Sequence, residues 1–531
     1  MIYGIDLGTT YSAIAECNDK GEATIVGNSQ DTAAKVNASI VYYDNMSGKP
    51  MVGNAAKNMM ASPDGVGQIL RLFKREMGKE YCETQIQYQA ENRMVSPVEG
   101  SACILHYLIQ FANLQRRDPV RKAVVTIPVS YTYKQRACVK KAAELAGIEL
   151  VGLLHEPTAA AVAYGIQQGE TILVFDLGGG TLDVSIVRLG LDENGQDKYE
   201  VLGIASDSNV FGEGEYIGGQ DWDNALRDLA LLDLPELDTN NQFTRNRLLL
   251  ISEDCKKMLS QLQKAPFTFN DHVVSVKRSD FVNVTLDLVE KCCHVVQWAI
   301  DDAQRKVTEK GETLNINRFV LTGGSSNMPM IRRELRKRFY EKYAQGRTEN
   351  EWIQLFAPEE AIAKGAAIYA YLVEQGRASF EEKSPYSYGT RCMSVINGNR
   401  VPCVQNLLFS SDPMVVIGRK VDFFASNPEW VNVDVFENEE LLETFVYDKD
   451  DTRCRLVGNV YQYHFDKDVE LGTPVHFAVT RDKDGIVGIV VSSDGHHEEH
   501  FSIDTKTSPI TPEVETQIRH SIELMDREDL E

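Results

Sequence analysis

The sequence lacks any segment that would carry the chain through a membrane or mark it for export. No uninterrupted apolar run approaches the ~20 residues that a membrane-spanning helix requires. The chain begins on an expected strand, without the charged region and apolar segment of a signal peptide. Its ten cysteines include no CxxC pair, so we expect buried, reduced thiols rather than a metal or redox site. These absences predict a cytoplasmic protein.

Positive charge is also scarce. The 531 residues include 78 acidic and 55 Lys or Arg side chains, which gives a formal net charge of -23. Such a field repels the phosphates of nucleic acids and the surface of anionic membranes, so we expect neither as a partner. Any anionic ligand of this chain would need a local concentration of positive charge and metal.

Two glycine-rich acidic segments stand out against this background, at residues 2–12 and 172–187. Each consists of a short apolar strand followed by an aspartate, an apolar residue, glycine and a hydroxyl residue. Glycine turns let backbone amides approach phosphate oxygens, and an aspartate can hold Mg²⁺ through its water shell. One such loop is compatible with an ordinary hairpin, whereas two copies predict lobes that close on a triphosphate from opposite sides. The matching residues are Asp6, Gly8, Thr9 and Thr10 in the first segment and Asp176, Gly178, Gly179 and Thr181 in the second.

The chain changes character near residue 376. Before it, apolar strands alternate with amphipathic helices, as at 123–131 and 134–148, which predicts parallel strands covered by helices. The polar segment 377–384 is expected to be a linker. Alternating strands then predict an antiparallel β domain over 385–505, with a hairpin at Asp484-Gly485. A helical segment is expected within 506–531, capped by Thr511 with Pro512 at its first position.

Several side chains have both a chemical and an ordinary structural interpretation. Lys74 would neutralise the charge of a terminal phosphate. Alternatively, Lys74 and Arg75 are two cations on the protein surface. Glu156 would face the cleft, or it favours the start of a helix. Asp183 is a further metal-side carboxylate or the next residue of the loop. Two groups remain open in the same way: a third glycine turn at Gly323, Gly324 and Ser325, and one face of a helix with Glu253, Lys256, Lys257 and Ser260.

Seven ordered motifs resemble the DnaK-type 70-kDa heat-shock chaperone family. The resemblance covers residues 1 to about 375 and continues weakly to the end. It implies an α/β actin-like ATPase domain with two ribonuclease-H-like lobes, here residues 1–376. It further implies an all-β sandwich that holds unfolded or extended apolar polypeptide, followed by a short C-terminal helix. The motifs are IYGIDLGTTYS, VTIPVSYTYKQR, LLHEPTAAAVAYG, FDLGGGTLDVS, IGGQDWDN, LTGGSSNMP and APEEAIAKGAA.

By this resemblance the chain hydrolyses ATP slowly to ADP and phosphate. Mg²⁺ is the expected cofactor, with K⁺ as a further candidate, and a nucleotide-exchange factor and a J-domain cochaperone are the family's partners. The implied hydrolysis residues are Lys74, Glu156, Asp176, Thr181 and Asp183, with Asp6 and Asp176 near the metal. The implied nucleotide contacts are Gly8, Thr9, Thr10, Tyr11, Gly178, Gly179, Gly180, Gly218, Gly219, Glu253, Lys256, Lys257, Ser260, Gly323, Gly324, Ser325, Asn327 and Glu359. Pro128 and Arg136 resemble the family's relay between domains.

The sequence departs from the family in several places. Asn327 replaces an arginine that covers the adenine, which should weaken nucleotide binding by about a kcal/mol. Gly152 replaces a basic residue that meets the J-domain, which argues against that docking. The acidic, leucine-rich linker and the helical lid are missing, and residues 206–216 look like an insertion.

The peptide groove is the loosest part of the match. The five side chains that alignment places near it fit pockets for an extended peptide, and they fit a plain sandwich core equally well. A nucleotide-sensing peptide or scaffold module is therefore an alternative function, and an actin-superfold kinase of small molecules is a third. The groove candidates are Cys392, Met393, Phe423, Val431 and Val433.

Overall fold

A computed structural model describes most of the chain. The residues outside its description are 28–34, 89–90, 115, 118, 193, 212–214, 235–236, 238, 310, 345, 379–385, 397, 410–415, 439–441, 450–453, 482–486, 503–508 and 527–531. The chain divides into two compact units. Unit 1 comprises Met1–Pro128, Cys138–Phe380 and Ile510–Glu531, and unit 2 comprises Val129–Ala137 and Glu381–Pro509.

Unit 1 contains two sheets with the same strand arrangement. The first has the order β11-β10-β1-β2-β3 with β4 added beside β2, and the second has the order β14-β13-β12-β17-β18. In each, the strand that carries the glycine loop is central. The first sheet is formed by β1 (Tyr3–Asp6), β2 (Tyr11–Cys17), β3 (Ala23–Ile25), β4 (Asn37–Ala38), β10 (Lys122–Ile127) and β11 (Glu149–His155). The second is formed by β12 (Thr171–Leu177), β13 (Leu182–Leu191), β14 (Asp197–Ser206), β17 (Arg318–Thr322) and β18 (Ile353–Leu355).

Both sheets are mixed, which corrects the expectation of parallel strands. β1 runs parallel to β10 but antiparallel to β2, and β12 runs parallel to β17 but antiparallel to β13. The connections 7–10 and 178–181 are too short for a crossover, so the chain can only return antiparallel. Each glycine loop is therefore the tip of a hairpin at the end of a central strand, which holds its backbone in place.

Helices α4 (Glu156–Ala163) and α12 (Ala361–Glu374) pack closely against each other and against the first sheet. Their contact depends on small residues. A Cβ on Gly365 would lie 1.8 Å from the carbonyl oxygen of Ala159, so only glycine allows this approach. Ala159, Ala160 and Ala366 are buried in the same core, where Val174 and Val320 of the second sheet also lie. This packing ties the two sheets of unit 1 to a common helical layer.

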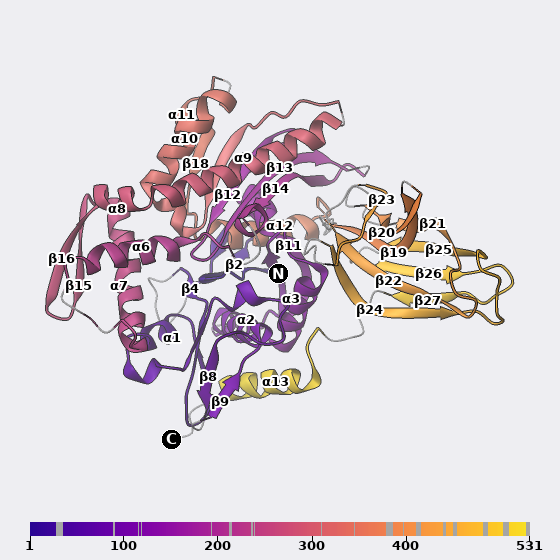
Figure 1. Cartoon of the computed structure of the whole chain (residues 1–531). Coiled ribbons are helices and arrows are strands. Elements are labelled where there is room, and N and C mark those ends of the chain that lie inside the picture. The colour runs from indigo at the N-terminus through magenta and orange to yellow at the C-terminus, as the bar shows by residue number, and fades with distance from the viewer. Residues whose placement is uncertain are drawn as a thin grey trace. The chain divides into compact units, whose positions relative to one another are not determined.

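The remaining elements of unit 1 surround these sheets (Figure 1). Near the amino terminus lie β5 (Ile40–Tyr43), β6 (Pro50–Val52), α1 (Asn54–Met59), η1 (Pro63–Gly65), β7 (Ile69–Arg71), η2 (Phe73–Glu76), β8 (Gln85–Tyr88), β9 (Glu91–Met94), α2 (Pro97–Asn113) and the part of α3 (Tyr133–Leu145) that begins at Cys138. Further along lie α5 (Asp207–Phe211), α6 (Gly219–Leu231), α7 (Gln242–Gln261), β15 (Lys264–Phe269), β16 (His272–Lys277), α8 (Arg278–Val284), α9 (Leu286–Glu309), η3 (Gly324–Asn327), α10 (Pro329–Tyr343) and α11 (Glu349–Trp352).

The C-terminal helix α13 (Pro512–Asp526) belongs to unit 1 and lies beside α2 (Figure 1). Its start agrees with the sequence, since the amide of Val514 donates to Thr511 Oγ1 at 3.4 Å and Pro512 is the first helical residue. Ile518 is fully buried, and the hydroxyl of Ser521 donates to the buried carboxylate of Glu99 at 2.7 Å. The helix is therefore anchored by both an apolar and a polar contact.

Unit 2 contains two antiparallel sheets, of order β23-β20-β19-β22-β24 and β21-β25-β26-β27. Val433 and Tyr463 of the first sheet share a core with Val475, Phe477 and other residues of the second. The expected hairpin at Asp484-Gly485 and most of the expected linker lie outside the described residues. The strands are β19 (Ser387–Ile396), β20 (Asn399–Leu408), β21 (Val416–Phe424), β22 (Trp430–Asn438), β23 (Thr444–Val446), β24 (Cys454–His464), β25 (Pro474–Arg481), β26 (Val487–Ser492) and β27 (Glu499–Ser502).

Across the described ranges, none of the helices has both the length and the apolar character that crossing a bilayer would demand.

Candidate functional site

Both glycine loops of unit 1 line a cavity of about 570 Å³, and the two loops lie close against each other there. A Cβ on Gly179 would lie 2.4 Å from Thr10 Oγ1, and one on Gly180 would lie 2.7 Å from Thr9 Cγ2. The hydroxyl oxygen of Thr10 is buried and has no hydrogen-bond partner among the described residues. The missing side chains of Gly179 and Gly180 let the two loops approach this closely, and the unused hydroxyl of Thr10 offers a hydrogen-bond donor to a phosphate oxygen.

Hydrogen bonds from neighbouring elements fix both loops. Ser39 Oγ donates to the carbonyl oxygen of Gly8 at 2.7 Å, and the amide of Gly8 donates to Ser12 Oγ at 3.1 Å. On the other wall the amide of Gly219, the first residue of α6, donates to the carbonyl oxygen of Gly178 at 3.0 Å. Gly218 and Gly219 thus support the second loop, and the loop geometry is set before any ligand arrives.

Four carboxylates and one lysine gather at the ends of β1, β12 and β13 and the start of α4. Lys74 Nζ and Glu156 Oε1 are 2.6 Å apart, and both side chains are under a tenth exposed. Burial, reinforced by the charge of Glu156, raises the pKa of Asp6 to about 7 and holds those of Asp176 and Asp183 well above the usual range. One ammonium does not balance four carboxylates, so this end of the cavity calls for added positive charge.

The donors fit a hydrated magnesium ion. Among the described residues no group of three His, Cys, Asp or Glu side chains could hold a metal directly. Mg²⁺ keeps several waters and binds through one or two carboxylates together with phosphate oxygens. Asp6 is the last residue of β1, Asp176 is the last but one of β12, and both line the cavity, so these are the carboxylates suited to this mode.

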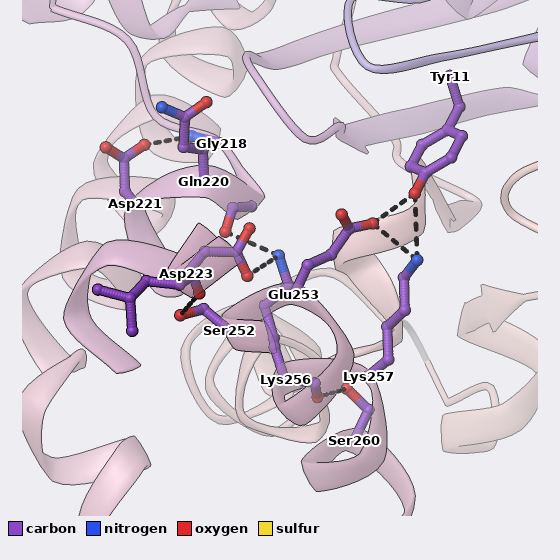
Figure 2. Close-up of polar contacts among 12 residues, drawn as sticks. Tyr11, Gly218, Gln220, Asp221, Asp223, Ser252, Glu253, Lys256, Lys257 and Ser260 are labelled. Atoms are coloured by element: carbon purple, nitrogen blue, oxygen red, sulfur yellow. Dashed lines mark hydrogen bonds and ion pairs between the residues drawn. The ribbon is translucent and has the colours of Figure 1, made fainter. Parts of the chain in front are cut away.

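The opposite part of the cavity is formed by α7 (Figure 2). Tyr11 donates to Glu253, and Lys257 Nζ lies 2.7 Å from that carboxylate. Lys57 Nζ also lies 2.7 Å from it. Burial alone would raise the pKa of Glu253, but the two lysines hold it at about 2. Lys256 Nζ lies 2.8 Å from both Asp223 Oδ1 and the carbonyl oxygen of Gly219. Glu253, Lys256, Lys257 and Ser260 all line the cavity, so this face of α7 is not a solvated charged face.

The third glycine turn also reaches the cavity. Gly323 has φ 78°, and a Cβ there would lie 2.5 Å from Asp176 Oδ1. The side-chain amide of Asn327 donates to the carbonyl oxygen of Gly324 at 3.0 Å, so Asn327 is held against its own turn. Gly324, Ser325 and Glu359 line the cavity beside it. The structure thus brings together residues from three distant sequence motifs.

Other predicted site residues lie elsewhere. Pro128 follows β10 in unit 1, whereas Arg136 lies in the segment assigned to unit 2, where its Nε donates to the carbonyl oxygen of Tyr131 at 2.9 Å. Among the groove candidates Val433 is a core residue, and Phe423 and Val431 pack against the same core. Met393 is 59% exposed and Cys392 is half-buried.

Sequence reasoning missed several cavity residues. Lys57 comes from α1 and meets Glu253 across 196 positions, so no local pattern marks it. Arg71 ends β7 with no recognisable motif. Gln220 and Asp223 also line the cavity, and they belong to the GGQDWDN motif, of which only the glycines are predicted from the sequence to be site residues. Membership of that motif is the sequence signal that could have identified them.

A duplicated β-sheet core with facing glycine loops defines a class of two-lobed α/β proteins with a polyphosphate-sized cleft. The family model described as Hsp70 protein matches residues 2–394. The chain is 34% identical over 387 residues to "Chaperone protein DnaK" of Mycoplasmopsis agalactiae, an alignment that covers 69% of this chain and 58% of that protein. The chain therefore belongs to the Hsp70 family, and it spans a little under three fifths of the length of this relative.

The raised pKa of Asp6 gives a testable dependence of stability on pH. Asp6 titrates at about 7 when folded, far above an unfolded aspartate, so between about pH 4 and pH 7 the folded state binds the extra proton. The free energy of unfolding contributed by Asp6 should therefore fall as pH rises through this window. Asp6→Asn should flatten that fall, as measured by urea unfolding of both proteins at pH 4.5, 5.5, 6.5 and 7.5 without nucleotide. Parallel curves for the two proteins would show that Asp6 is not held protonated.

Proposed function

We propose that this chain is an ATP-dependent molecular chaperone that binds and hydrolyses ATP to control its hold on unfolded polypeptide. The observation that carries the proposal is that the loops at Gly8–Thr10 and Gly178–Gly179 line one cavity together with Lys74 and Glu156. Backbone amides of both loops would bind the β- and γ-phosphates of ATP. The name of the DnaK relative supports a chaperone.

Hydrolysis would take place at the buried pair. Lys74 Nζ would stabilise the charge of the terminal phosphate, while the carboxylate of Glu156 accepts a hydrogen bond from the attacking water and orients it. Thr181 and Asp183 flank this position at the start of β13. Magnesium, held at Asp6 and Asp176, would supply further positive charge against the phosphates. Burial of the pair excludes bulk water and strengthens each of these interactions.

The adenosine part of the nucleotide would lie along α7. Glu253 and the lysines that hold it ionised offer an acceptor for ribose hydroxyls, and Ser260 and Gly323–Ser325 would border the base. Unit 2 would supply the peptide site, because a two-sheet sandwich offers strand edges and pockets to an extended chain. Met393, which is exposed on β19, is the groove candidate best placed to meet such a peptide.

Removal of the catalytic cation tests the hydrolytic assignment. Lys74→Ala should lower the single-turnover rate of ATP hydrolysis by about a hundredfold, since one electrostatic donor to a transition state is typically worth that much. ATP affinity should change far less. Lys79→Ala, which removes a half-exposed lysine from the same segment, is the matched control and should hydrolyse ATP at the unmutated rate. Equal rates for Lys74→Ala and the control, at equal ATP occupancy, would refute the mechanism.

A second candidate is a nucleotide-sensing peptide module with little ATPase coupling, favoured by the short, locally bonded side chain of Asn327. Coupling distinguishes the two. For a chaperone, an extended apolar peptide should raise ATP turnover severalfold, and ATP should accelerate release of a fluorescent form of that peptide. Stopped-flow release and steady-state turnover measure the two directions. Peptide binding with neither effect would select the module instead.

A further inference from the structure

One cation in the cavity has no acidic partner. Lys57, Lys74, Lys256 and Lys257 all line the cavity, and each lies within 2.8 Å of a carboxylate oxygen. Arg71 lines the same cavity, but within the described chain its guanidinium makes no ion pair and only Nη2 is used, as a donor to the amide oxygen of Gln220. The remaining donors of Arg71 are therefore available to a ligand.

The position of Arg71 can be read from its neighbours. Arg71 ends β7, three residues before Lys74. Its partner Gln220 donates its backbone amide to the carbonyl oxygen of Gly179 at 2.9 Å, so Gln220 is bound to the second glycine loop. Arg75 donates to Gly180 of that loop, and its guanidinium carbon lies 4.7 Å from the centre of the Tyr216 ring. Arg75, unlike Arg71, is not among the described residues that line the cavity. Arg71 thus lies at the phosphate end of the cavity.

The electrostatic surroundings of Arg71 also favour binding of an anionic ligand. Burial lowers the pKa of its guanidinium, Asp223 and Glu253 act against that shift, and Arg75 adds to it. Asp223 and Glu253 already form ion pairs with lysines, at 2.8 and 2.7 Å respectively. A partly buried charge without a close counter-ion is costly, and a phosphate group placed in the cavity would offset that cost. Guanidinium groups suit phosphate because two parallel N–H donors match two oxygens.

We propose that Arg71 is a phosphate-binding residue of this chain, which holds the polyphosphate of the bound nucleotide from the β7 wall of the cavity. The proposal rests on the nucleotide-binding function proposed above and names a contact beyond it. In this chain Arg71 would place a cation at the phosphates of the nucleotide. Asn327, at the base, has no charge to offer. Affinity for the nucleotide then depends more on its phosphates than on its adenine.

Nucleotide affinities of two variants test this contact. Arg71→Met keeps the length and apolar character of the stem, and it should weaken ADP and ATP binding by about tenfold or more, as expected for loss of a charge-assisted hydrogen bond. Adenosine, which has no phosphate, should bind within twofold of the unmutated protein. Arg71→Lys keeps the charge and should recover part of the ADP affinity. Calorimetry with Mg²⁺ and each of the three ligands gives these numbers.

A surface variant and a melting experiment complete the design. Arg333→Met makes the same replacement at an exposed position of α10 and should leave all affinities unchanged. Without nucleotide, Arg71→Met should melt no lower than the unmutated protein, because the charge has no acidic partner to lose. ADP should raise its Tm less than it raises that of the unmutated protein.

Three results would overturn the inference: unchanged ADP and ATP affinity in Arg71→Met, an equal loss for adenosine, or a collapse of the nucleotide-free Tm. The first removes the contact, the second moves Arg71 to the nucleoside, and the third makes it structural. Failure of the unmutated protein to bind ATP is a separate result, which would end the proposed function and this inference together.

Discussion

Concentrated negative charge at the base of one cavity is the constraint on which the rest of unit 1 depends. Asp6, Asp176, Asp183 and Glu156 are brought together with a single ammonium, that of Lys74, in a place where water does not screen them. Burial of several carboxylates destabilises the fold unless cations balance their charge. The fold tolerates the arrangement because the central strands and α4 fix these side chains. The free energy that burial of the carboxylates costs would be recovered in part if a metal ion bound there together with a phosphate near Lys74.

Duplication of one sheet explains how a single chain makes this site. Both sheets carry a glycine loop at the tip of a hairpin that starts from a central strand, and each central strand has an aspartate at or next to its end that lines the cavity. Packing of α4 against α12, which depends on Gly365, belongs to the layer that joins the sheets. Two equivalent halves therefore present equivalent loops to one ligand.

Local sequence patterns predicted the features that local chemistry determines. The glycine loops, the helix at Glu156–Ala163 and the Thr511 cap with Pro512 all follow from residue types within a few positions. Strand direction was predicted less well, because the alternation of strands and helices conceals the hairpins β1–β2 and β12–β13. Those hairpins follow only when the four-residue connection lengths are weighed.

Pairs that meet only in the folded chain could not be predicted. Lys57 with Glu253 and Arg71 with Gln220 join elements that are far apart in sequence, and Lys256 with Asp223 joins two successive helices. Each partner alone resembles an ordinary surface residue. The groove candidates show the reverse problem. Alternating apolar residues of a sandwich fit a core and a peptide pocket equally well from sequence, and in the structure Val433 lies in the core.

The measurement that tests the account most directly is calorimetric titration of the whole chain with ATP, first with Mg²⁺ and then with the metal chelated. Facing phosphate loops above a cluster of carboxylates predict binding of one ATP per chain with Mg²⁺ and much weaker binding without it, since the phosphates and carboxylates would then repel each other. Absence of binding in the presence of Mg²⁺, or equal affinity after chelation, would contradict the account.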